Sequence, residues 1–96
     1  MAKGYWITLY HSVSDPAALA EYAKHATPAI EAGGGRFVVR GMPAKTCEAG
    51  VADRAVVIEF ESVEKAIATY ESSRYQAAYK IVEGKVRRDV RFVQGV

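Results

Sequence analysis

The chain has little of several features that would point to particular classes of protein. Its single cysteine, Cys47, excludes an intrachain disulfide and favours a reducing compartment. Its two histidines belong to no Cys-x-x-Cys or His-Glu-x-x-His pattern, so we predict no metal site and no cofactor. Its longest apolar runs, of which residues 55–58 are one, are far shorter than the ~20 residues of a membrane helix. Residues 1–4 also lack the apolar segment of a secretory signal, so we expect a cytoplasmic protein without membrane contacts.

The chain also lacks a large excess of either positive or negative charge. The 13 basic and 11 acidic side chains are interspersed and give a formal charge of +2, which argues against a nucleic-acid partner. One dense basic cluster exists, Lys85, Arg87 and Arg88, with Arg91 beyond it. We interpret this cluster as a solvated loop before the last strand. The 96 residues, half of them apolar, are predicted to form a single domain, 1–96.

The strongest β-strand signal is residues 54–60, Arg-Ala-Val-Val-Ile-Glu-Phe. Its β-branched and aromatic residues favour a pleated, buried surface. Five of the seven residues are apolar, which is typical of a strand covered on both faces, yet Glu59 lies inside the run. A lone buried carboxylate is costly unless it is paired or protonated. We therefore expect Val56, Ile58 and Phe60 to face helices, and Glu59 to face a second covering layer.

The other elements follow from capping residues and from apolar periodicity. Asp15 and Pro16 begin a helix to about residue 32, which ends at the glycines 33–35. Because Pro28 removes a helical hydrogen bond, we expect a kink near residues 24–27 or a restart at Thr27. Strands are predicted over residues 4–12, 36–42 and 89–94. A second helix begins at Ser62 and divides at residues 72–73, where Ser73 and Gln76 form a capping box; the second segment closes at Gly84.

This order, strand-helix-strand-strand-helix-strand, predicts an α+β, ferredoxin-like βαββαβ fold. Four antiparallel strands would form one sheet, with strands one and three central and both helices on one face. The facing of the first strand stays open, because both of its alternating sets are bulky. Since strand three is apolar on both faces, we expect a second copy of the chain to cover the open face, as a homodimer or a higher homo-oligomer.

Several sequence blocks together resemble the bacterial domain-of-unknown-function family 1330. They are Gly4-Tyr5-Trp6-Ile7, Asp15, Tyr22, Gly34-Gly35-Arg36-Phe37, Val39-Arg40-Gly41, Val56-Val57-Ile58-Glu59-Phe60, Ser62 and Ser73-Arg74-Tyr75-Gln76. The resemblance covers nearly the whole chain and implies a dimeric α+β barrel, in which two such sheets face each other. It implies no assigned reaction. The chain departs from the usual pattern at Met42, Glu61 and Arg74.

Candidate catalytic residues are Glu59, Arg40 and His11. We expect Glu59 and Arg40 to meet across neighbouring strands, as a general base and an anion holder or as an ion pair that only holds the dimer together. His11, at the end of the first strand, is a third candidate because it can titrate near neutrality. Tyr10, Trp6 and Arg36 are candidate ligand-binding residues, although core packing also explains the aromatic ones.

Two functions stay open at this point. One is a cofactor-independent enzyme acting on a small molecule, by analogy with oxygenases and isomerases that use dimeric α+β barrels; haem degradation is a further variant of it. The other is a non-catalytic protein for metabolite binding or assembly. Glu59 discriminates between them, because Glu59→Gln should abolish turnover in the first case and weaken the dimer if Glu59 is structural.

Overall fold

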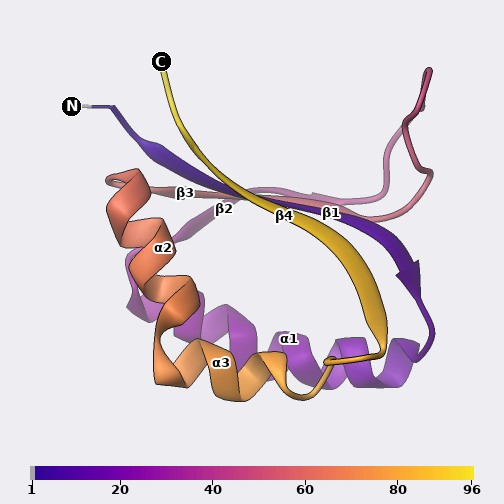
Figure 1. The fold of residues 1–96 in the computed structure, drawn as a ribbon, viewed down its shortest axis with the longest axis horizontal. Helices are drawn as coiled ribbons and strands as arrows, with labels where there is room; N and C mark the ends of the chain where they lie inside the picture. Colours follow the sequence, from indigo (N-terminus) through magenta and orange to yellow (C-terminus); the bar gives the residue numbers. More distant parts are fainter. Residues whose placement is uncertain (1) are drawn as a thin grey trace.

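A four-stranded antiparallel sheet lies over three helices that all cover the same face (Figure 1). The computed structural model describes residues 2–96. The elements, in chain order, are β1 (Gly4–Val13), α1 (Pro16–Ala32), β2 (Arg36–Gly41), β3 (Ala55–Phe60), α2 (Val63–Glu71), α3 (Ser73–Tyr79) and β4 (Val86–Gln94). The ferredoxin-like α+β fold predicted from the sequence is therefore confirmed. Within residues 2–96, no helix has both the length and the apolar character needed to cross a bilayer.

The strand order is β2-β3-β1-β4, so the two strands predicted to be central are central. Trp6, Thr8 and Tyr10 of β1 are buried toward the helices, which settles the facing of this strand. Val56, Ile58 and Phe60 of β3 are buried on the same side, as expected. The opposite face carries Val57 and Glu59 and has no helix over it (Figure 1).

A β-bulge in β2 changes which face its arginines occupy. Arg36 pairs with Glu59 and Phe37 with Ile58, but the next pair is Val39 with Val57. Val38 is thus an extra residue, and an extra residue reverses the facing of all that follow. Arg40 then pairs with Val56 and shares its helix-facing side, whereas Arg36 shares the open face with Glu59.

Helix α1 begins and ends where its capping residues predict. The Asp15 carboxylate accepts a hydrogen bond from the Ala18 amide at 3.1 Å, and the helix continues through Pro28 to Ala32 without the restart that we considered. Gly34 then adopts a positive φ of 94° that other residues avoid. At Gly35 the chain passes so close to the core that an added Cβ would lie 2.6 Å from Ile30 Cγ2.

The second helical segment divides as predicted, but at a different cap. Ser62 caps α2 by accepting from the Lys65 amide at 3.2 Å. The cap of α3 is Ser72 rather than Ser73, because the Ser72 hydroxyl accepts from the Tyr75 amide. Gln76 donates to the Tyr70 carbonyl instead of closing a capping box. Helix α3 also ends at Tyr79, before the predicted Gly84, which occupies the turn before β4 with a φ of 77°.

Strand β4 begins at Val86, three residues earlier than its predicted start. The basic cluster interpreted as a solvated loop therefore lies partly within the sheet. Arg88 pairs with Tyr10 of β1 and shares its face with Val90 and Phe92, which pair with Thr8 and Trp6. The physical reason is the period-two pattern Val86, Arg88, Val90, Phe92, in which the arginine takes a core-facing place.

Candidate functional site

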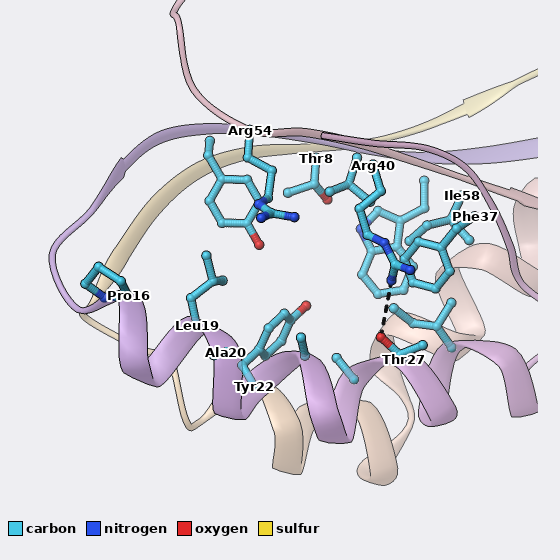
Figure 2. A pocket seen from close by; sticks show the side chains of 16 residues that line it. Thr8, Pro16, Leu19, Ala20, Tyr22, Thr27, Phe37, Arg40, Arg54 and Ile58 are labelled. Atoms are coloured by element: carbon cyan, nitrogen blue, oxygen red, sulfur yellow. Dashed lines mark hydrogen bonds between the residues drawn. The ribbon is translucent and has the colours of Figure 1, made fainter. Parts of the chain in front are cut away.

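A cavity of about 280 Å³ lies between α1 and the helix-facing side of β1, β2 and β3 (Figure 2). It is close to the lower end of the range for small-molecule sites, about 300–1,000 Å³. We refer to it as the helix–sheet cavity. Its walls are mostly apolar, with Leu19 on the helix side and Phe37 and Ile58 on the sheet side.

The cavity exists because small residues of α1 face the sheet. Ala20, Ala23 and Ala26 line it, and none of these side chains is long enough to reach the strands. Helix α1 packs mainly against α3 rather than against the sheet. The space under the sheet therefore remains open along one side of α1, where Ala20 and Ala23 are exposed.

Two arginines reach the cavity from the sheet. Arg40 of β2 stacks over the Phe37 ring at 4.3 Å and lies 3.5 Å from the Thr27 hydroxyl of α1 (Figure 2). Arg54 precedes β3, is half-buried, and points into the cavity from the other side of Thr8 (Figure 2). Within residues 2–96 neither arginine forms an ion pair, and neither Asp nor Glu lines the cavity.

Trp6 contributes a buried donor without a partner. Its side chain lines the cavity and is 1% exposed, and its indole Nε1 meets no acceptor among residues 2–96. The rest of the ring is tightly packed, with Tyr75 edge-on at a centroid distance of 4.8 Å. An unsatisfied buried donor costs about 1–3 kcal/mol, and such groups are rare in folded proteins. The Trp6 side chain borders the cavity, but its N–H is enclosed by the packing around the ring.

Tyr10 and Tyr22 also line the cavity, and Arg88, which does not line it, forms hydrogen bonds to both of their hydroxyls. The guanidinium donates to the hydroxyl oxygens of Tyr22 at 3.2 Å, Tyr75 at 3.0 Å and Tyr10 at 3.4 Å. The hydroxyls of Tyr22 and Tyr75 are themselves 2.7 Å apart. In Figure 2 the Tyr22 hydroxyl points from α1 into the cavity. Burial raises the pKa values of Tyr10 and Tyr75, so both stay protonated near neutral pH.

The open face of the sheet carries a separate polar group. Glu59 accepts from Arg36 at 2.8 Å and from the Tyr5 hydroxyl at 3.0 Å. The hydrogen bond from Arg36, followed by that from Tyr5, lowers the pKa of Glu59. The predicted contact between Glu59 and Arg40 is therefore wrong, because the bulge at Val38 turns Arg40 to the other side of the sheet. A carboxylate with a lowered pKa is also a weaker base.

His11 lies outside the helix–sheet cavity, in a groove that shares Tyr10 and Arg54 with it. It is exposed on the open-face side of β1, next to the irregularity that interrupts the β1–β4 pairing. It lines a groove of about 400 Å³ together with Asp89, Arg91 and residues of the 43–54 loop. Glu59 pairs with Tyr5, six residues from His11 along the strand, which corresponds to about 20 Å. A single subunit does not bring the two together.

A model of the family called Domain of unknown function (DUF1330) matches residues 3–96. The chain belongs to the DUF1330 family. The match covers nearly the entire chain and confirms the resemblance noted in its sequence blocks. No curated protein matches the chain.

Solved structures similar to this DUF1330 protein share its fold at low sequence identity. A protein of unknown function from Rhodopseudomonas palustris is 17% identical with a TM-score of 0.76, over 99% of this chain and 83% of that one. A proposed antibiotic biosynthesis monooxygenase from Caulobacter crescentus is 19% identical with a TM-score of 0.60, over 99% and 90%. A dimeric ferredoxin-like protein of unknown function from Thermobifida fusca is 16% identical with a TM-score of 0.55, over 97% and 91%.

The structure of this DUF1330 protein divides the predicted site residues into three places. Trp6, Tyr10 and Arg40 meet at the helix–sheet cavity, Arg36 and Glu59 meet on the open face, and His11 lies in the loop groove. The sequence-based site predictions missed Arg54 and Arg88. Arg54 alternates with the buried Val56 and Ile58, and Arg88 alternates with Val90 and Phe92, which are partly buried against the core. This alternation is the signal in the sequence that could have identified both arginines.

Proposed function

We propose that this DUF1330 protein is a homodimer in which each subunit binds a small, largely apolar organic molecule in the helix–sheet cavity. The observation that carries the proposal is the helix–sheet cavity itself, a mostly apolar space of about 280 Å³ whose lining includes Tyr22, Arg40 and Arg54. Core packing alone leaves this space unfilled. A bound molecule would fill it, with its apolar part against the walls and a polar group near these side chains.

The size of the cavity suggests the size of the ligand. An engineered apolar cavity of about 150 Å³ accommodates benzene. A cavity of about 280 Å³ is nearly twice as large and corresponds to about two fused rings. Naphthalene is therefore a suitable probe for the apolar part of the ligand.

The homodimer is supported by the chemistry of the open face. Leu9 of the central strand β1, and Val39 and Val93 of the two edge strands, lie on it and are 40%, 49% and 45% exposed, and such exposed apolar side chains mark an interaction surface when they gather on one face. The Arg36–Glu59 and Asp89–Arg91 pairs lie on the same face and neutralise its charge. The structural neighbour from Thermobifida fusca is described as dimeric, which supports a sheet-to-sheet pair here.

A cofactor-independent enzyme is the second candidate, and one observation favours it. The structural neighbour from Caulobacter crescentus is a proposed monooxygenase, and this chain places two tyrosine hydroxyls beside an apolar cavity, where they can stabilise charge that develops on a substrate. In this case Arg40, Tyr10 and Trp6 would contact the substrate. Glu59, Arg36 and His11 lie outside this cavity and would contact a substrate only if it were bound between the two facing sheets of the dimer.

Trp6 provides the test of binding, because it is the only tryptophan and gives one indole N–H signal in a nitrogen–proton correlation spectrum. We expect naphthalene to shift that signal in a saturable way. Ala23→Phe, which places a ring in the cavity, should abolish the shift. Ala17→Phe is the matched control, because Ala17 is exposed on the same helix and does not line the cavity. An Ala23→Phe variant that still binds would exclude this cavity as the site.

Glu59→Gln separates the two candidate functions. It keeps the helix–sheet cavity intact, because Glu59 lies on the opposite face of the sheet. The variant should therefore bind naphthalene like the wild type. If oxygen consumption is detected with an aromatic substrate in the wild type and is lost in Glu59→Gln, the result supports an enzyme that uses Glu59 as its base on a substrate bound between the sheets rather than in the helix–sheet cavity.

A further inference from the structure

The hydrogen-bond polarity around the helix–sheet cavity is fixed by Arg88, which does not itself line the cavity. A guanidinium only donates, so each tyrosine oxygen that contacts Arg88 must accept. Tyr10, Tyr22 and Tyr75 are all in this position. The protons of their hydroxyls must then point elsewhere.

The proton of Tyr75 has one available acceptor. Tyr75 is fully buried, and within residues 2–96 the only oxygen in hydrogen-bond contact with its hydroxyl belongs to Tyr22, at 2.7 Å. Tyr75 therefore donates to Tyr22. The Tyr22 oxygen then accepts from both Tyr75 and Arg88, and these two bonds use both of its lone pairs.

Tyr22 is thereby left with its own O–H to donate, and its hydroxyl points into the cavity (Figure 2). The Tyr10 hydroxyl is also left with its own O–H to donate. Its oxygen accepts from Arg88, and its O–H has no acceptor among residues 2–96. The cavity therefore presents two phenolic donors that Arg88 orients.

Two further charged groups beside the cavity also donate hydrogen bonds and accept none. The guanidinium groups of Arg40 and Arg54 can only donate, and both side chains line the cavity. Among residues 2–96, neither a carboxylate nor an imidazole lines it. A positively charged ligand would meet only uncharged acceptors, such as the hydroxyls of Thr8 and Thr27, and its charge would lie beside two cations.

We propose that the ligand of the helix–sheet cavity is an aromatic or cyclic organic anion of about two rings, a carboxylate or an enolate, whose oxygen accepts hydrogen bonds from Tyr10 and Tyr22. Arg88 is a positioning residue for both hydroxyls, and Arg40 and Arg54 provide the counter-charge. This inference rests on the proposed function and adds the charge and the polarity of the ligand to it.

Three probes of the same ring size test the inference on the intact wild-type protein: 2-naphthoate, naphthalene and 2-naphthylmethylammonium. The Trp6 indole N–H signal follows binding of each, and calorimetry gives the affinities. We expect 2-naphthoate to bind at least tenfold more tightly than naphthalene, because hydrogen bonds to a charged acceptor are the strong ones. The ammonium compound should bind at least tenfold more weakly than naphthalene.

Variants assign the preference to the tyrosines. Tyr10→Phe and Tyr22→Phe should each lower the affinity for 2-naphthoate about tenfold and leave naphthalene binding nearly unchanged. Tyr79→Phe is the matched control: its ring lies beside Arg88 at 5.4 Å, yet it does not line the cavity, so neither affinity should change. If Tyr22→Phe fails to fold, Tyr10→Phe decides, because the Tyr10 bond to Arg88 is the longest of the three.

The outcomes separate the two proposals. If naphthalene binds and 2-naphthoate binds no more tightly, or if the ammonium compound binds as tightly, the anion inference is overturned while the proposed function stands. If 2-naphthoate is preferred but both Phe variants keep the preference, the assignment to Tyr10 and Tyr22 is overturned. If none of the three probes binds, the proposed function fails and the inference fails with it.

Discussion

The guanidinium Nη1 of Arg88 lies 3.2 Å from the hydroxyl oxygen of Tyr22. This contact joins an edge strand of the sheet, β4, to the helix on the other side of the core, α1. The same guanidinium holds Tyr75 of α3 at 3.0 Å. One cation therefore connects three elements and sets the direction of the hydroxyls that face the helix–sheet cavity.

Arg88→Lys should destabilise the protein. An ammonium group keeps the charge but lacks the planar fork that spans three hydroxyls, and lost hydrogen bonds to a charged donor cost about 1.5–3 kcal/mol. Urea denaturation measures the change in the free energy of unfolding. Arg87→Lys is the control, because Arg87 is exposed on β4. An Arg88→Lys variant as stable as the wild type would show that the fork is not needed.

Gly35→Ala should lower the free energy of unfolding by about 1–3 kcal/mol, the usual cost of overpacking a core. The added methyl would lie 2.6 Å from Ile30 Cγ2 and 2.7 Å from Phe60 Cζ. Gly41→Ala is the control, because nothing lies within 4 Å of the Cβ position there. Equal stability of the two variants would contradict the packing described at the start of β2.

Glu59 should contribute a pH-dependent part of the stability. Its pKa in the folded protein is lowered by Arg36 and then by Tyr5, so the folded state favours the ionised carboxylate. The contribution is present above the unfolded-state pKa of about 4.3 and is lost as the pH falls through the lower folded pKa.

Unfolding of the wild type and of Glu59→Gln, measured between about pH 2 and pH 7, checks this expectation, since the range spans the ordinary Glu pKa of about 4.3. The wild type should exceed the variant near neutrality, and the difference should shrink in acid. A constant difference across the range would mean that ionisation of Glu59 does not stabilise the fold.

Light scattering at micromolar concentration tests the homodimer. Val57→Asp places a charge at the centre of the open face, on β3, and should convert a dimer into a folded monomer. Ile67→Asp is the control, because Ile67 is 37% exposed on α2, on the helical side of the sheet. A wild-type monomer would refute the homodimer, and a dimeric Val57→Asp variant would refute the sheet-to-sheet interface.

The order of the elements could be predicted from the sequence because each signal was local. Asp15 with Pro16, and Ser62, begin helices through hydrogen bonds to amides three residues away, which the structure confirms. The central place of residues 54–60 followed from their apolar character on both faces. These features depend on neighbours in the chain and need no tertiary information.

The pairing of the site residues could not be predicted, because it depends on strand register. The single extra residue Val38 reverses the facing of Arg40, so the expected contact with Glu59 is replaced by one between Arg36 and Glu59. A bulge leaves no clear mark in a run such as Arg-Phe-Val-Val-Arg. The place of Arg88 is hard to predict for a different reason: a basic cluster indicates a solvated loop, whereas the alternation of Arg88 with Val90 and Phe92 places its side chain toward the core.

A crystal structure of the protein with 2-naphthoate tests the central claim most directly. We expect the rings between α1 and the sheet, near Leu19 and Ala23, with the carboxylate within hydrogen-bond distance of the Tyr10 and Tyr22 hydroxyls. A carboxylate that points out to solvent would contradict the proposed donor pair. Rings bound on the open face of the sheet, with the helix–sheet cavity empty, would contradict the site itself.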